Sequence, residues 1–208
     1  MRSPYPPGVP ATAEHATAYA RVGLLGNPSD GFFGQTLAVT ISNFWAEAWA
    51  WPSDRVHLQP HELYDSQDFT NLTELSAVSV RDGYSGGHRL MMATVHRFAR
   101  HMTERGVDVS APFTITYHTN VPRQVGLAGS SAIITALLRA LFKIFKLSDR
   151  LDELDLPPRQ RLANFVLSIE TEELGISAGL QDRVAQTHEG CVFMDFAKHW
   201  FDERGYGE

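Results

Sequence analysis

A glycine-rich turn between residues 122 and 132 contains residue types that can bind an anion. Its sequence, PRQVGLAGSSA, ends in the pair Ser130 and Ser131 and leads into the apolar run IITALLRALFKIF. A helix that begins at such a turn directs free backbone N–H groups and its positive dipole end at one point, where phosphate is the commonest biological ligand. No lysine completes the pattern G-x-x-x-x-G-K-[ST], which argues against a Walker-type loop. We therefore expect a nucleotide bound by another arrangement.

The elements that would position this turn follow from the spacing of apolar residues. Alternation predicts strands, and recurrence every three to four residues predicts helices. The expected strands cover residues 17–26, 37–42, 45–51, 56–58 and 113–117, and a last one begins at Cys191. The expected helices cover residues 89–105, the run after Ser131, and residues 160–174 and 181–187. Residues 61–79 are predicted as a loop. This order predicts an α+β fold, with helices packed on a mainly antiparallel sheet, rather than a doubly wound parallel one.

Composition narrows the class of protein. The chain has 208 residues, 43% of them apolar and 20% charged, as in ordinary globular domains. A net charge of −6 indicates neither a nucleic-acid partner nor an anionic membrane surface. No apolar run reaches the length of a membrane-spanning helix. The single cysteine, Cys191, excludes an intrachain disulfide and favours the cytoplasm; within its predicted strand we expect it to be buried. Residues 1–16 are predicted as a disordered leader and residues 17–208 as one folded domain.

Three segments, in this order, resemble the kinase superfamily of galactokinase, homoserine kinase, mevalonate kinase and phosphomevalonate kinase. The first, RVGLLGNPSD, matches a family motif in spacing at Arg21, Gly26 and Asp30. The second is the turn, which matches at Pro122, Gly126, Leu127, Ser130, Ser131 and Ala132. The third, ETEELGISAGLQD, matches at Glu170, Gly175, Gly179 and Asp182. A lone G-x-x-G-S-S could be no more than a turn with a helix cap, but three ordered matches favour the kinase interpretation.

The resemblance implies a fold, two ligands and a set of site residues. The fold would be the N-terminal, ATP-binding domain of these kinases, an α+β fold shared with a domain of a ribosomal protein. Mg²⁺ would be held by Ser131 and Glu170, with Glu172 as an alternative ligand, and Asp182 would be the catalytic base, oriented by Arg21. Asn27 and Asp30 would bind sugar hydroxyls. The residues that would bind the ATP phosphates are Gly126, Leu127, Ala128, Gly129, Ser130, Ser131 and Ala132.

The substrate expected from the sequence is an acidic sugar. Within the superfamily, the chain resembles the glucuronokinase family in particular. The resemblance lies in three stretches: GNPSD of the first motif, the PRQVGLAGSSA form of the second, and ELGISAGLQDRVAQ of the third. The wider motif has an acid and a His or Asn where this chain has Asn27 and Pro28, which removes a negative charge from the sugar pocket. Our own interpretation adds Arg183 and Arg123 as candidate partners of a substrate carboxylate. The expected reaction is ATP-dependent phosphorylation of the anomeric hydroxyl of D-glucuronate to give glucuronate 1-phosphate.

Three alternatives remain open at this point. The sugar could be arabinose or galactose, or the chain could be a non-catalytic remnant that binds a nucleotide. Family members continue into a second α+β domain that carries a third glycine-rich motif. The sequence stops at Glu208, so we expect a fragment, a truncated gene model or a protein that has lost catalysis. The oligomeric state is not predicted.

Overall fold

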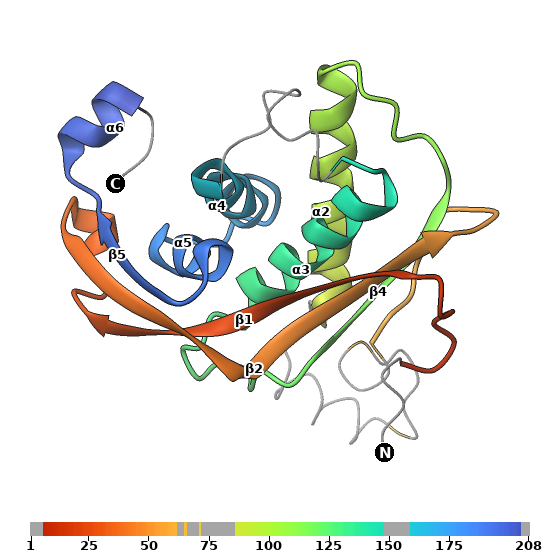
Figure 1. Cartoon of the computed structure of the whole chain (residues 1–208), viewed down its shortest axis with the longest axis horizontal. Coiled ribbons are helices and arrows are strands. Elements are labelled where there is room, and N and C mark those ends of the chain that lie inside the picture. The colour runs from red at the N-terminus through yellow and green to blue at the C-terminus, as the bar shows by residue number, and fades with distance from the viewer. Residues whose placement is uncertain (1–5, 62–64, 66–70, 72–85, 148–158, 205–208) are drawn as a thin grey trace.

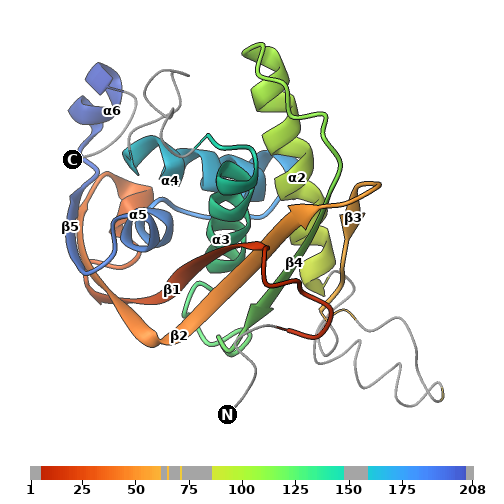
Figure 2. The ribbon, with the colours of Figure 1, turned by 45° about the vertical axis from the view of Figure 1, so that its right-hand side comes forward.

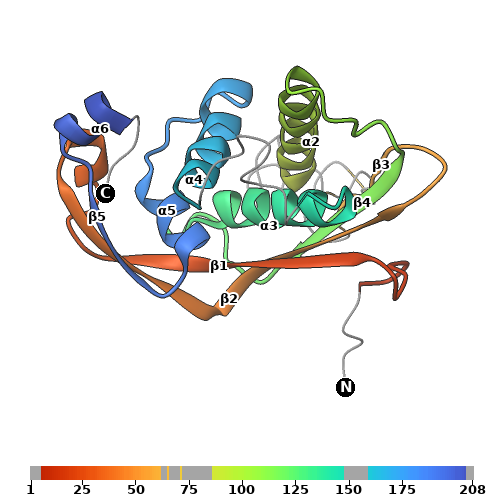
Figure 3. The ribbon, with the colours of Figure 1, turned by 45° about the horizontal axis from the view of Figure 1, so that its top comes forward.

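The computed structural model describes residues 6–61, 65, 71, 86–147 and 159–204. In this part of the chain a five-stranded sheet carries helices on one face (Figure 1 and Figure 3). The helices α2, α3, α4 and α5 all lie on the same side of the sheet (Figure 3). Among the described residues, no helix is both long and apolar enough to cross a bilayer.

The sheet is mainly antiparallel, which confirms the predicted α+β class. Its strands are β1 (Glu14–Leu25), β2 (Gln35–Pro52), β3 (His57–Leu58), β4 (Phe113–Thr119) and β5 (Cys191–Asp195). Strand β2 pairs with β1 along one edge and with β4 and β5 along the other, and β3 joins β4 as the only parallel pair of the described sheet. Strand β5 therefore lies at the end of the sheet far from β3 (Figure 2).

Two predicted strands, at residues 37–42 and 45–51, are in fact one. Strand β2 runs without a break from Gln35 to Pro52. Its register with β1 jumps, because Ala20 pairs with Ile41 while the preceding Tyr19 pairs with Trp45. The gap at residues 43–44 between the two predicted strands therefore marks a bulge and not a turn, since extra residues on one strand shift the side-chain phase without ending the pairing.

Alanines on the inner face of the sheet let the central helix approach closely. Ala46, Ala48 and Ala50 of β2 are fully buried, as are Ala18 and Ala20 of β1. Residues between them point to the other face of the sheet, because side chains alternate along a strand. On that other face Trp49 is buried and stacks on His15, with ring centroids 4.9 Å apart. Trp49 therefore contributes to packing on this second face of the sheet.

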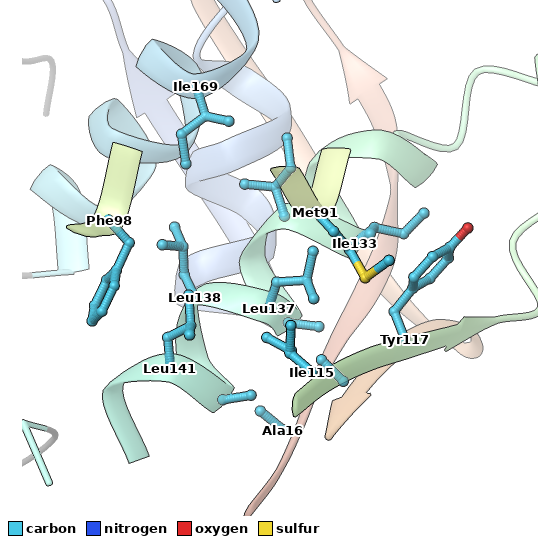
Figure 4. Close-up of a cluster of buried hydrophobic side chains, with 14 of the residues drawn as sticks. Ala16, Met91, Phe98, Ile115, Tyr117, Ile133, Leu137, Leu138, Leu141 and Ile169 are labelled. Atoms are coloured by element: carbon cyan, nitrogen blue, oxygen red, sulfur yellow. The ribbon is translucent and has the colours of Figure 1, made fainter. Parts of the chain in front are cut away.

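Helix α3 (Gly129–Ile144) is the centre of the core. Its residues Leu137, Leu138 and Leu141 are fully buried among side chains of β4, α2 (Gly86–Glu104) and the 159–173 segment (Figure 4). Burial of each leucine is worth about 1.5–3 kcal/mol relative to exposure. Because α3 is held along its length, its N-terminus and the glycine-rich turn before it have a defined position.

The C-terminal third supplies the acidic residues of the site. Helix α4 (Arg159–Ser168) continues into a π-helical turn, η3 (Ile169–Glu173), and is followed by α5 (Gln181–His188) and α6 (Lys198–Arg204). These elements confirm the predicted helices at residues 160–174 and 181–187. A short 3-10 turn, η1 (Ser29–Phe32), follows β1.

Other expectations differ from the structure or lie outside it. Strand β1 begins at Glu14, three residues before the predicted start of the first strand at residue 17. Cys191 is exposed rather than buried, because it opens the short strand β5 at the margin of the sheet. Most of the predicted loop at 61–79, and residues 1–5, lie outside the described residues.

Candidate active site

The glycine-rich turn adopts a backbone that leaves the start of α3 open. Gln124, Gly126 and Ala128 have positive φ angles of 59°, 76° and 57°. Ala128 is the N-cap residue of α3 and makes no side-chain cap hydrogen bond. The first N–H groups of a helix have no partner within it, so they are available to an anion here. The turn is held from behind, because Gln186 Nε2 of α5 donates to the Ala128 carbonyl at 2.9 Å.

A cavity of about 350 Å³ lies beside this turn. Its walls include residues 121–130, the start of α2 at Gly86 and Gly87, and Tyr117 of β4. The size falls in the range of small-molecule pockets. Of the seven residues predicted to bind phosphate, Gly126 to Ser130 line the cavity, whereas Ser131 and Ala132 are fully buried and do not.

The start of α2 is fixed at this cavity by Asp65. Its Oδ1 accepts hydrogen bonds from the backbone N–H of Gly87 (2.6 Å) and His88 (3.1 Å), and its Oδ2 accepts from Tyr117 Oη and the His61 N–H, both at 3.0 Å. A Cβ atom on Gly87 would overlap Tyr117 Oη. The sequence analysis did not single out Asp65, because it lies in the predicted loop. The only sign in the sequence of a close contact here is the pair Gly86–Gly87, just before the predicted helix.

His61, in the same cluster, is kept neutral. Burial is the main cause that lowers the pKa of His61 to about 4; the neighbouring His118 and Arg123 lower it further, whereas Asp65 acts in the opposite direction. Its ring lies against the rings of Tyr117 and His118, with centroids 5.3 and 5.0 Å away. A charged imidazole is therefore disfavoured at this place in the fold.

Arg21 joins the first and third motifs to the turn. Its Nε donates to Asp182 Oδ1 at 2.5 Å, Nη2 contacts the same oxygen, and Nη1 donates to the carbonyl of Gly126 at 2.7 Å. Arg21 is buried on β1, while the Asp182 side chain at the start of α5 retains 22% exposure. The carboxylate is thus oriented by a fixed cation yet reachable from outside.

Glu170 faces the start of α3, but its partner there is Ser130. Ser130 Oγ donates to Glu170 Oε1 at 2.7 Å, whereas Ser131 Oγ turns back to the Ala128 carbonyl at 3.1 Å. The expectation that paired Ser131 with Glu170 differs from this arrangement, because successive side chains on a helix point about 100° apart. Ser130 Oγ and Glu170 Oε1 are hard oxygens close enough to contact one cation, a donor set that fits Mg²⁺.

Glu172, the alternative metal ligand, points elsewhere. It pairs with Arg97 of α2 at 2.7 Å, and its side chain is 58% exposed. Glu170 in the same π-helical turn is completely buried. Residues two apart on a helix lie on opposite sides, so only Glu170 can face Ser130.

Arg183 and Asp30 act on the framework of the site. Arg183 is buried, and its guanidinium contacts Glu170 Oε2 through Nε (2.7 Å) and Nη2, and the Gly179 carbonyl through Nη1 (2.8 Å). Its guanidinium is thus occupied by groups of the protein itself, whereas we expected it to bind a carboxylate of the substrate. Asp30 Oδ2 accepts a hydrogen bond from the Gln181 N–H at 3.1 Å and lies where a Cβ atom on Gly179 would be, so it supports the loop before Asp182. Asn27 is exposed in the turn after β1.

The class of protein follows from this fold, this site and a matching family model. Residues 89–190 match the family described as GHMP kinases N terminal domain. The chain therefore contains the N-terminal domain of a GHMP kinase, as its three motifs imply.

Two known kinases are similar to this chain in sequence. The chain is 44% identical over 198 residues to Glucuronokinase 1 of Arabidopsis thaliana, which covers 95% of this chain and 52% of that protein. It is also 27% identical over 135 residues to D-glycero-alpha-D-manno-heptose 7-phosphate kinase of Campylobacter jejuni, covering 64% of this chain and 36% of that protein. The chain thus spans about half the length of Glucuronokinase 1.

Solved structures share the fold at low identity. The galactokinase of Lactococcus lactis, complexed with galactose, superposes with a TM-score of 0.65 at 16% identity, over 90% of this chain and 46% of that one. The phosphomevalonate kinase of Streptococcus pneumoniae, in complex with phosphomevalonate and AMPPNP, gives a TM-score of 0.65 at 16% identity, over 91% and 53%. These likenesses establish the architecture of the domain.

Proposed function

We propose that this chain is the nucleotide-binding part of an ATP-dependent sugar kinase that phosphorylates the anomeric hydroxyl of D-glucuronate. The products would be glucuronate 1-phosphate and ADP. The observation that carries the proposal is the Arg21–Asp182 pair, anchored on the Gly126 carbonyl, which puts a partly exposed carboxylate next to a helix start suited to phosphates. The choice of sugar is supported by the 44% identity to Glucuronokinase 1 along nearly the whole chain.

In this mechanism Asp182 is the general base. Its carboxylate accepts the proton of the anomeric hydroxyl as that oxygen forms a bond to the γ-phosphorus, while the bond between the γ-phosphorus and the bridging oxygen of ADP breaks. Arg21 holds the carboxylate in one orientation through two contacts on Oδ1. Asn27 and Asp30, in the turn after β1, would bind sugar hydroxyls, and the lack of an acid at Asn27 and Pro28 suits a negatively charged sugar.

The turn from Gly126 to Ser130, which lines the cavity, would bind the ATP phosphates. Its uncapped N–H groups and the dipole of α3 attract negative charge despite the net charge of −6. Mg²⁺, held by Ser130 and Glu170, would supply charge neutralisation on the phosphates when bound. We also propose a cytoplasmic enzyme, because ATP is available there and an exposed Cys191 thiol stays reduced.

A substrate panel tests the proposal. The protein with its full natural sequence should release ADP from Mg-ATP in the presence of glucuronate, and more slowly with galactose or arabinose. Phosphorus NMR of the product should give the signal of a sugar 1-phosphate. Faster turnover of a neutral sugar would reject glucuronate as the substrate, and nucleotide binding without turnover of any sugar would support the non-catalytic alternative.

A further inference from the structure

Four charged side chains form one connected line through the site. Arg21 contacts Asp182, Asp182 contacts Arg183, and Arg183 contacts Glu170. The signs alternate, so the line is neutral as a whole. Both of its ends meet the glycine-rich turn, because Arg21 Nη1 donates to the Gly126 carbonyl and Glu170 Oε1 accepts from Ser130 Oγ. The two carboxylates are thus linked to each other and to both ends of the turn.

Arg183 is the only member of this line that touches both carboxylates. Its Nε and Nη2 atoms face Glu170 Oε2, and Nη1 lies 3.3 Å from Asp182 Oδ2 and 2.8 Å from the Gly179 carbonyl. Each of its three nitrogen atoms therefore has a partner within the protein. Its side chain is 5% exposed, which leaves little surface for a substrate group.

Glu170 depends on this contact because it has no access to solvent. A fully buried carboxylate needs a charged or hydrogen-bonded partner for each oxygen, and Arg183 satisfies Oε2 while Ser130 satisfies Oε1. The planar guanidinium reaches Glu170 and Asp182 in two directions at a fixed angle, which a lysine ammonium on a flexible stem cannot reproduce.

We infer that Arg183 is a positioning residue that holds the carboxylates of Glu170 and Asp182 in one fixed relation to each other and to the glycine-rich turn. The inference rests on the proposed function, in which these carboxylates bind the cation and accept the proton. Arg183 thereby couples two steps, because a displacement of either carboxylate is transmitted to the other through one rigid group.

Two variants at this position, with a matched control, test the coupling. Arg183→Gln removes the positive charge. Arg183→Lys keeps the charge but removes the planar guanidinium, which contacts both carboxylates. Arg139→Gln is the control, because Arg139 also joins several partners: Glu189 directly after α5, and the carbonyls of Thr17 on β1 and Gln186 on α5. None of these residues lines the cavity. The full natural protein is assayed for kcat and KM with glucuronate. Mn²⁺ affinity in the presence of AMPPNP is measured separately.

The expected result is a loss of kcat of about 10²-fold in Arg183→Gln, the size of effect that a small misplacement of reacting groups produces, with KM for glucuronate unchanged. Mn²⁺ affinity should fall about 10–100-fold, as for other residues that orient a metal ligand. Arg183→Lys should recover thermal stability more than it recovers kcat. Arg139→Gln should lose stability but keep both kcat and Mn²⁺ affinity.

Two outcomes would overturn the inference. A raised KM for glucuronate at unchanged kcat would make Arg183 a substrate ligand, and an Arg183→Gln protein that behaves like Arg139→Gln would make it a structural residue only. If Arg183→Gln fails to fold, the Arg183→Lys variant tests the inference instead. Wild-type kcat and wild-type Mn²⁺ affinity in Arg183→Lys would show that the guanidinium is not needed to position the two carboxylates. A wild-type protein that binds Mn²⁺ and AMPPNP without sugar turnover would reject the proposed function, and the Mn²⁺ comparison among the variants would still decide the role of Arg183.

Discussion

Ser130 and Glu170 lie 40 residues apart in the sequence and meet through a 2.7 Å hydrogen bond from Ser130 Oγ to Glu170 Oε1. The contact joins the start of α3 to the π-helical turn after α4. A π-helical turn inserts an extra residue into a helix and is frequent at functional sites. Here it directs Glu170 inward, while Glu172 remains on the outside with Arg97.

The first prediction separates the two serines. Ser130→Ala should weaken Mn²⁺ binding in the presence of AMPPNP by about 10–100-fold, because a hydrogen bond to a charged group is worth about 1.5–3 kcal/mol. Ser131→Ala should have a smaller effect on the metal, since its hydroxyl donates to the Ala128 carbonyl. A larger loss of Mn²⁺ affinity in Ser131→Ala than in Ser130→Ala would identify Ser131 as the metal ligand, as predicted from the sequence.

The second prediction concerns the base. Asp182→Asn should lower kcat by about 10²–10⁴-fold, the usual contribution of a general base, and should leave nucleotide affinity unchanged. The control is Asp202→Asn, the same chemical change at an exposed position of α6. Coupled ADP assays and calorimetry measure the two effects. Undiminished turnover in Asp182→Asn would remove this residue from catalysis.

The third prediction tests the ion pair through stability. Arg21→Met should lower the free energy of unfolding by about 2–3 kcal/mol, below the range for a fully buried broken pair because Asp182 keeps some exposure. The double variant Arg21→Met with Asp182→Asn should be more stable than Arg21→Met alone, since it no longer contains a carboxylate that has lost its main partner and keeps only the 3.3 Å contact with Arg183. Urea unfolding of the wild-type protein, the two single variants and the double variant measures the interaction energy between Arg21 and Asp182. Losses of stability that simply add up would contradict a direct interaction between them.

The fourth prediction concerns the wall of the cavity. Gly87→Ala should destabilise the protein by about 1–3 kcal/mol, as overpacking does, because the new methyl group would overlap Tyr117 Oη. It should also weaken nucleotide binding, since the start of α2 lines the cavity. Gly31→Ala is the control, because a Cβ atom there would meet nothing within 4 Å. Equal thermal stability of the two variants would show that the contact with Tyr117 is not restrictive.

The fifth prediction is a pH dependence of stability caused by His61. Its pKa is about 4 in the folded protein and about 6.5 in an unfolded chain. Between these values the unfolded state takes up a proton that the folded state does not, so the free energy of unfolding should fall as the pH is lowered from 6.5 towards 4. His61→Gln should reduce this slope, whereas His57→Gln, at the exposed position of β3, should not. Identical slopes in all three proteins would exclude His61 as the cause.

Local patterns were enough to predict most elements and the residues of the three motifs. The apolar face of α3 follows from the spacing of Leu137, Leu138 and Leu141, since a helix buries residues three to four apart. The open start of that helix follows from the turn that precedes it. Arg21 and Asp182 were predicted as one catalytic pair from the resemblance, and the structure brings them into contact.

Tertiary packing decided the contacts that local pattern leaves open. Which serine faces Glu170 depends on the rotation of α3 against the π-helical turn, and Arg183 is buried because α5 packs on the segment that carries Glu170. The same holds for Asp65, because three of its four hydrogen bonds come from segments distant in the sequence. Residue types and spacing determine which side chains lie on one face of an element. The partner of each side chain depends on how separate elements approach, because its position is set by contacts between residues far apart in the chain.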